Sequence, residues 1–285
     1  MAAASVSDGL WDLDFDPAEL VQPAGEAPET ESLTETRAVA DPALHGSRAV
    51  AGRGGGRALG YLGGRKTMNH LTLLAAADLH GIFPIYEWLV ETANRRADVL
   101  VLAGDLFDAD FAERQRQQAT RIVALLREAR PPVLYLMGND DEVELGYEDA
   151  RIQSAHGRRI EVGGFSFVGY QYTDPFVGDV FVKPEAEIAR DLEQLGPLLD
   201  ANTVLVTHMP AFGWCDQTFG DHVGSRPLAG MLALRPVLAH IHGHIHEAFG
   251  RDGIHFNAAC AGLCRAILIE LPSLQHEVIE FQRRG

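Results

Sequence analysis

Between residues 70 and 137 the chain alternates continuous apolar runs with longer amphipathic stretches, and this alternation restricts the fold more than any other feature. The apolar runs are typical of strands buried on both faces: Leu71–Ala77, Asp98–Ala103 and Val133–Met137. Residues 84–96 and 111–129 have a helical pattern, and Pro131-Pro132 closes the second of them. Strand, helix, strand, helix, strand predicts parallel βαβ units.

The second half of the chain predicts shorter strands with fewer helices. Arg159–Val162 and Phe165–Tyr170 flank Gly163-Gly164, as in a hairpin. Residues 184–200 and 227–234 are expected to be helical. The remaining predicted strands are Thr203–Thr207, Val237–His242, Ile254–Asn257, Arg265–Leu271 and Glu277–Phe281. Because the later strands are short and consecutive, we expect an antiparallel layer there. The fold class is α/β, with two packed mixed β-sheets flanked by helices.

The composition changes near residue 67. Residues 1–45 are rich in Ala, Glu, Asp, Pro and Thr, and residues 46–66 are rich in Gly and Arg. Neither stretch can bury enough apolar surface to offset the entropy lost on ordering. We therefore predict a mostly disordered N-terminal extension over 1–67 and a folded domain over 68–285.

Charge and cysteine content limit the partners and the compartment. The net charge of −16 disfavours non-specific binding to nucleic acid. No run of about 18 apolar residues is present, so no membrane span is expected. The cysteines are Cys215, Cys260 and Cys264, without a CxxC pair, which favours a reducing setting. The N-terminus does not resemble a secretory signal, and we expect a cytoplasmic protein.

A polar cluster follows each of the first three predicted strands, and two more follow later strands. The clusters are Asp78-Leu79-His80, Gly104–Asp108, Gly138–Asp141, Thr207–Pro210 and Gly243–His246. Ligands of open α/β sheets bind beyond the carboxyl ends of the strands, so we expect these clusters to meet at one edge.

The side chains in these clusters have the composition of a two-metal site. The candidate ligands are Asp78, His80, Asp105, Asn139, His208, His244 and His246. Mixed nitrogen and oxygen donors suit Mn²⁺, Fe, Zn²⁺ or Co²⁺ better than Mg²⁺ or Ca²⁺. Seven donors exceed one tetrahedral site and match two ions about 3.5–4 Å apart with a bridging carboxylate. Such a pair supplies hydroxide and polarises phosphoryl oxygens, which predicts phosphoester hydrolysis.

The order DxH, GDxxD, GNxD, a strand ending in His, and GHxH resembles the calcineurin-like metallophosphoesterase superfamily over roughly residues 70–282. The resemblance implies a four-layer sandwich of two sheets and flanking helices. It also implies that Asp78, His80 and His246 hold the first metal and that Asp105 bridges. The second metal would be held by Asn139, His208 and His244.

The third motif departs from the family pattern. It usually contains GNH followed by an acid, and here it is Gly138-Asn139-Asp140-Asp141. The missing histidine helps to protonate the leaving oxygen in the family. The catalytic residues that we predict are Asp140, in its place, and His208. A carboxyl can act as a general acid only with a raised pKa, and metal cations nearby would lower the pKa of Asp140. Activity is therefore expected to favour esters with good leaving groups, or the substrate is expected to supply the acid.

Two functions follow from the resemblance. The first is hydrolysis of a small phosphodiester or phosphomonoester, with the diester favoured and Mn²⁺ as the expected metal. The alternative is a non-catalytic scaffold or binding module, as in members that resemble the retromer subunit. The GDLFD motif lacks the arginine that follows it in Ser/Thr protein phosphatases, which argues against that branch.

Other polar residues have weaker assignments. Asp141 is expected to orient Asn139 or a neighbouring histidine, or to cap a helix over 142–154. Asp108 is expected to support a ligand or cap a loop, and His242 to be a core histidine with its hydrogen bonds satisfied. Near the mouth of the site, the residues that could line a substrate pocket are Trp214, Phe219 and Arg226.

Overall fold

The computed structural model describes residues 70–109, 111–175, 180–260 and 264–281. The chain divides into two units, Met1–Gly63 and Gly64–Gly285, and every described residue belongs to the second. The predicted disorder of residues 1–67 therefore lies outside the described residues.

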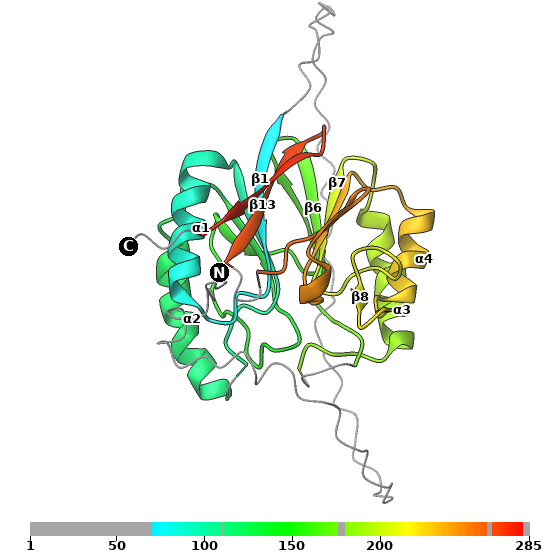
Figure 1. Ribbon diagram of the computed structural model, residues 1–285, viewed down its shortest axis with the longest axis horizontal. Coiled ribbons are helices and arrows are strands. Elements are labelled where there is room, and N and C mark those ends of the chain that lie inside the picture. Colours follow the sequence, from blue (N-terminus) through cyan, green and yellow to red (C-terminus); the bar gives the residue numbers. More distant parts are fainter. Residues whose placement is uncertain (1–69, 110, 176–179, 261–263, 282–285) are drawn as a thin grey trace, which may run out of the picture. The chain divides into compact units, whose positions relative to one another are not determined.

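The first sheet has six strands in the order β14-β13-β1-β2-β3-β4. Its strands are β1 (Leu71–Ala76), β2 (Val99–Ala103), β3 (Val133–Leu136), β4 (Ile152–Ser154), β13 (Arg265–Leu271) and β14 (Gln275–Glu280). Strands β1 to β4 are parallel, whereas β13 pairs antiparallel with both β1 and β14. The predicted βαβ units account for the parallel pairing of β1, β2 and β3 (Figure 1), whereas β4 was not predicted.

The second sheet also has six strands, in the order β11-β12-β10-β7-β6-β5. They are β5 (Arg159–Val162), β6 (Phe165–Tyr170), β7 (Thr203–Thr207), β10 (Ala239–His242), β11 (Gly250–Asp252) and β12 (His255–Asn257). The four central strands are parallel, and β5 and β11 close the edges in the antiparallel sense. A two-stranded hairpin, β8 (Gln217–Thr218) and β9 (Asp221–His222), lies in the loop after β7.

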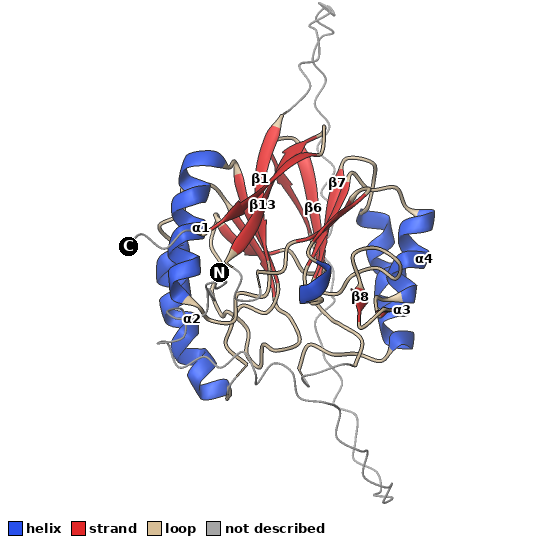
Figure 2. Cartoon of the chain, viewed as in Figure 1, coloured by secondary structure: helices blue, strands red, loops and turns tan. Residues whose placement is uncertain are grey.

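Helices cover the outer faces of both sheets (Figure 2). They are α1 (Phe83–Arg96), α2 (Ala112–Leu126), α3 (Glu185–Leu195) and α4 (Arg226–Leu234), with 3₁₀ turns at Gly196–Leu198 and His246–Ala248. Helices α1 and α2 pack on the first sheet, and α3 and α4 pack on the second. Two mixed sheets flanked by helices are the predicted fold. Among the described residues, no helix has both the length and the apolar character needed to span a bilayer.

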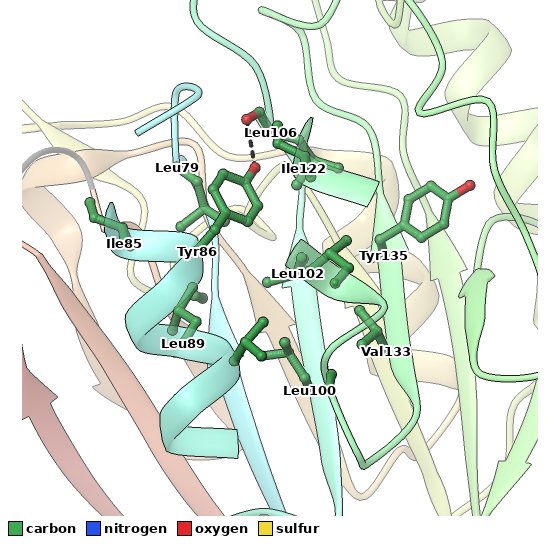
Figure 3. Packing of buried hydrophobic residues seen from close by; sticks show 14 of the residues in the cluster. Leu79, Ile85, Tyr86, Leu89, Leu100, Leu102, Leu106, Ile122, Val133 and Tyr135 are labelled. Carbon is green, nitrogen blue, oxygen red and sulfur yellow. Dashed lines mark hydrogen bonds between the residues drawn. The ribbon is translucent and has the colours of Figure 1, made fainter. Parts of the chain in front are cut away.

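Alternating side chains of the central strands enter two different cores, which explains the continuous apolar runs. In β2, Leu100 and Leu102 face the helices and pack near Tyr86 of α1 (Figure 3). Val99 and Val101 of the same strand lie in the core that contains residues of both sheets. A buried residue of this size stabilises the fold by about 1.5–3 kcal/mol. Tyr86 also donates a hydrogen bond of 2.6 Å to the carbonyl of Leu106, which ties α1 to the turn after β2.

Two local expectations were wrong. The helix expected over 142–154 is absent. Asp149 accepts hydrogen bonds from the backbone N–H groups of Arg151 and Ile152, which forms a turn at 149–152, and Ile152–Ser154 is strand β4. The late strands are only partly antiparallel, since β12 runs parallel to β10. The unpredicted strand β11 turns the chain back at the sheet edge and makes that parallel pairing reachable.

The two sheets are joined where the chain leaves β4. The N–H of Ala155 donates to the carbonyl of Tyr135 in the first sheet, and the N–H of Gly169 in the second sheet donates to the carbonyl of Ala155. His156 follows in this seam, and its Nδ1 accepts the N–H of Gln171 at 3.3 Å. Burial, and then the nearby Lys183 ammonium, lower the pKa of His156 to about 4.

We predict that His156→Gln reduces the acid sensitivity of the fold. The unfolded chain protonates His156 near pH 6.5 and the folded chain only near its pKa of about 4, so folding stability falls as the pH drops from 6.5 towards 4. The loss of unfolding free energy between pH 7 and pH 4.5 should shrink by about 1–3 kcal/mol in the variant. Urea unfolding at both pH values measures it.

The control is His70→Gln, which alters an exposed histidine at the start of the domain. Both variants retain every other buried histidine, so a difference between them isolates the seam. An equal loss of stability on acidification in native protein and His156→Gln would contradict the prediction.

Candidate metal centre

The seven predicted ligands all follow strand ends at one edge of the two sheets. They come after β1, β2, β3, β7 and β10 and are Asp78, His80, Asp105, Asn139, His208, His244 and His246. The sheets are joined at this edge, because the N–H of Ala77 donates to the carbonyl of Ala258, and the N–H of Cys260 donates to the carbonyl of Ala77. This junction brings the end of β1 beside the segment after β12, where the N–H of Ala258 donates to the carbonyl of His242 at the end of β10.

Asp78 is fully buried and connects the ends of β1 and β10. Its carboxylate oxygens each lie 3.1 Å from the backbone nitrogen of His244, whose N–H donates to them. Nε2 of His246 lies 3.1 Å from Oδ1 of the same carboxylate. One carboxylate thereby holds the backbone of one predicted ligand and the ring of another.

Asp105 has the same role between β2, β3 and β7. Its Oδ1 accepts the N–H of Asp140 at 2.9 Å, and its Oδ2 lies 3.2 Å from Nε2 of His208. The fixed backbone donor leaves the rest of the carboxylate directed at the ring of His208.

A backbone carbonyl on the side away from Asp105 orients the ring of His208. Its Nδ1 lies 2.8 Å from the carbonyl of Ala103, so Nδ1 carries a proton and Nε2 is the ring nitrogen left to bind a metal. Oδ1 of Asn139 lies 3.1 Å from that Nε2, and the ring of His244 lies 5.1 Å away, edge to face. Asn139, His208 and His244 are therefore close neighbours.

His80 lacks the partners that a buried imidazole normally has. Its side chain is 3% exposed, yet neither ring nitrogen has a hydrogen bond within the described part of the chain. Leaving such polar atoms unsatisfied is costly in a protein interior. A cation bound at the ring would satisfy this side chain.

The backbone is strained at four of the predicted ligands. Positive φ angles occur at Asp78 (56°), His80 (43°), Asp105 (50°) and His244 (70°). A residue other than glycine in this region costs of order 1–3 kcal/mol, and such residues are concentrated at functional sites.

Two motif glycines allow the chain to approach the carboxylates. A Cβ at Gly138 would lie 2.1 Å from Oδ1 of Asp105, and a Cβ at Gly243 would lie 2.3 Å from Oδ2 of Asp78. Neither distance is compatible with a side chain, so glycine is required at both positions for steric reasons.

Charge is balanced by pairing carboxylates with imidazoles. Burial alone would raise the pKa of Asp78, but the hydrogen bond from His246 and the charge of His208 hold it below its ordinary value. Burial alone would lower the pKa of His208, but Asp105 raises it to about 10. The protons on these imidazoles supply positive charge that a divalent ion would replace.

The donor atoms fit two ions. They form three groups in which all the donor atoms lie within 4.8 Å of one another: Asp78, His80 and His246; Asp78, Asp105 and His208; and His80, Asp105 and Asp140. Asp78, His80 and Asp105 each belong to two groups, so the three groups overlap in space. Asn139 and His244 adjoin the second group through His208.

Asp141 has a role that the sequence did not predict. It is fully buried, and it accepts the backbone N–H groups of Leu106, Phe107 and Gly138. It neither orients Asn139 nor caps a helix. Instead it fixes the turn after β3 against the turn after β2.

Asp108 lies outside the centre. Its carboxylate pairs with Arg114 at 3.3 Å, and its backbone bonds to Gln115 and Gln118 of α2. It therefore organises the start of α2.

His242 is fully buried as expected, but it is not satisfied. Its Nε2 has no hydrogen bond with any residue that the structure describes.

Two supporting residues were missed. Asn257 donates to the carbonyls of Ile245 and Cys215, and Arg265 donates to the carbonyl of His246. They hold the two sides of the turn that presents the last two histidines. The position of Asn257 at the end of a strand is a signal that could have identified it, whereas nothing near Arg265 in the sequence marks that residue.

Of the residues predicted near the mouth, Arg226 lines a cavity. Its guanidinium lies 3.7 Å over the ring of Phe212, in a hollow of about 320 Å³ that Asp174 and His222 also line. An adjoining recess, lined in part by Asp174, reaches His244. Trp214 instead stacks on His255, and Phe219 is 92% exposed.

Known proteins resemble this chain in sequence and in fold. A sequence model for a family described as calcineurin-like phosphoesterase matches residues 71–248, which include all seven predicted ligands. One crystal structure aligns with a TM-score of 0.62 and 16% identity, and the alignment covers 75% of this chain and 100% of that one. The protein TT1561 of Thermus thermophilus aligns with a TM-score of 0.57 and 16% identity, covering 74% of this chain and 98% of that one. These likenesses show a shared fold.

A curated protein is also similar in sequence. A UPF0046 protein of Caenorhabditis elegans is 28% identical over 116 residues, which are 39% of this chain and 39% of that protein. The chain thus spans well under half the length of this relative.

We predict that Gly243→Ala weakens divalent metal binding at least about 10-fold, because the added Cβ displaces Asp78 from the centre. Equilibrium dialysis against Mn²⁺ measures the affinity, and far-UV circular dichroism reports the fold. The matched control is Gly230→Ala in α4, where a Cβ meets nothing within 4 Å. Equal Mn²⁺ affinity in both folded variants would refute the steric argument.

Proposed function

The chain belongs to the calcineurin-like phosphoesterase family, and from this premise we propose that it hydrolyses a small phosphodiester or phosphomonoester at a two-metal centre. The observation that supports the proposal is the convergence of the predicted ligands at one sheet edge. Five of them form overlapping groups of donor atoms, and Asn139 and His244 adjoin His208.

The proposed ligands of the first ion are Asp78, His80 and His246, and those of the second are Asn139, His208 and His244. Asp105 is the proposed bridge. When bound, two such ions lower the pKa of water towards neutrality and neutralise charge on the phosphoryl oxygens. The mixture of imidazole, carboxylate and amide donors favours Mn²⁺, with Fe, Zn²⁺ and Co²⁺ as alternatives.

Hydrogen bonds from the backbone orient two of the proposed ligands. The carbonyl of Ala103 fixes the tautomer of His208, and the N–H of His244 fixes the carboxylate of Asp78. The cavity beside His244 is proposed to hold the rest of the substrate. In the adjoining hollow, Arg226 can contact a phosphoryl or other anionic oxygen.

We propose a diester ahead of a monoester. Asp140 stands where the family usually has a histidine, so a carboxylate replaces a group that can be cationic. A dianionic monoester is repelled by that carboxylate more strongly than a monoanionic diester. The chain also offers no imidazole at that position to protonate the leaving oxygen, which favours esters with good leaving groups.

We predict that the full chain with Mn²⁺ hydrolyses bis-p-nitrophenyl phosphate faster than p-nitrophenyl phosphate, and that Asp105→Asn loses at least about 100-fold in kcat/KM because a bridging charge is removed. Asp108→Asn is the matched control, because its carboxylate pairs with Arg114 outside the centre and its activity should be unchanged. Steady-state release of p-nitrophenol measures both.

A folded native chain that binds Mn²⁺ but turns over neither ester would favour the alternative of a non-catalytic scaffold. Equal activity of the two aspartate variants would contradict the proposed metal centre.

A further inference from the structure

Asp140 points into the metal centre. Its side chain is only 15% exposed, and its Oδ2 lies 3.8 Å from Nδ1 of His80. One donor atom each from Asp140, His80 and Asp105 lie within 4.8 Å of one another. This third group uses a residue outside the seven predicted ligands.

The two oxygens of Asp140 have different surroundings. Its Oδ1 accepts a hydrogen bond of 2.6 Å from Nδ2 of Asn139, so the amide oxygen of Asn139 faces His208. An amide turned the other way would present its nitrogen, which cannot bind a metal. The carboxylate of Asp140 thus sets the orientation of a predicted ligand, and its Oδ2 remains directed at His80.

The separation between Oδ2 of Asp140 and Nδ1 of His80 is one that a shared metal ion could span. At 3.8 Å it is too long for a hydrogen bond. Two ligands of one ion, with bonds of about 2.0–2.2 Å, lie at most about 4.4 Å apart. The distance fits two ligands of one ion, and both ring nitrogens of the buried His80 lack a hydrogen bond among the described residues.

We infer that Asp140 is a further metal ligand, on the side of the centre formed by His80 and Asp105, and that it also orients Asn139. The inference rests on the proposed two-metal centre and deepens it. It differs from the role of general acid predicted from the sequence, which requires a proton on the carboxyl group, whereas a ligand requires an ionised carboxylate. The added negative charge makes the centre selective for substrates of lower charge.

The test compares metal binding by the full-length native chain and by Asp140→Asn, using equilibrium dialysis and the electron paramagnetic resonance spectrum of bound Mn²⁺. We expect the weaker of the two bound ions to lose at least about 10-fold in affinity, with loss of the signal of a coupled ion pair at concentrations that saturate the native chain. Asp108→Asn, whose carboxylate lies outside the centre, should match the native protein.

A second variant keeps the test decisive if the amide substitution perturbs the fold. In Asp140→Ala, added formate should restore part of the Mn²⁺ affinity by supplying the missing carboxylate, and it should not change binding by Asp108→Ala. Circular dichroism confirms that each compared protein is folded.

The possible results separate the two roles of Asp140. Suppose that Asp140→Asn binds Mn²⁺ with native affinity, keeps the signal of the coupled ion pair, and hydrolyses only esters with poor leaving groups more slowly. Asp140 would then be a general acid and not a metal ligand. If the native chain binds no divalent ion, both this inference and the proposed function fail. If the native chain binds two ions and Asp140→Asn also does so with native affinity, only this inference fails.

Discussion

The burial of two carboxylates, Asp78 and Asp105, is the constraint on which the rest of the site depends. The two residues are 0% and 2% exposed, and an unpaired charge in such a place costs several kcal/mol. Asp78 is met by the N–H of His244 and the ring of His246, and Asp105 by the N–H of Asp140 and the ring of His208. These partners come from distant parts of the chain, so the charges are stable only when the sheet edge is assembled.

The fold meets this demand with parallel strands and tight turns. Parallel strands deliver their carboxyl ends to one edge, and the hydrogen bonds of Ala77 connect that edge to the second sheet. The turns then adopt left-handed backbone at Asp78, His80, Asp105 and His244, at a cost that a well-packed interior must offset. Strain and close approach are concentrated where the side chains have to converge.

The two adjacent aspartates of the third motif, Asp140 and Asp141, have different roles. Asp141 turns away from the centre and accepts three backbone N–H groups, which fixes the turn itself. Asp140 turns inward and contacts Asn139 and the neighbourhood of His80. Two residues of identical chemistry thus serve structure and site separately, since their side chains leave the turn in different directions. A more negative centre is the consequence, and it bears on which phosphoesters the chain can accept.

The sequence by itself determined the fold class, most strand and helix positions, and the set of polar clusters, because burial on both faces imposes continuous apolar runs and strand ends impose the place of the motifs. It did not determine the parallel pairing of β12, the irregular chain over 142–149, or the roles of Asp141, Asn257 and Arg265. Those depend on which backbone groups are left without partners once the sheets have packed. Only the tertiary structure brings such groups within hydrogen-bonding distance of side chains far away in the chain. Local sequence patterns do not specify these long-range contacts.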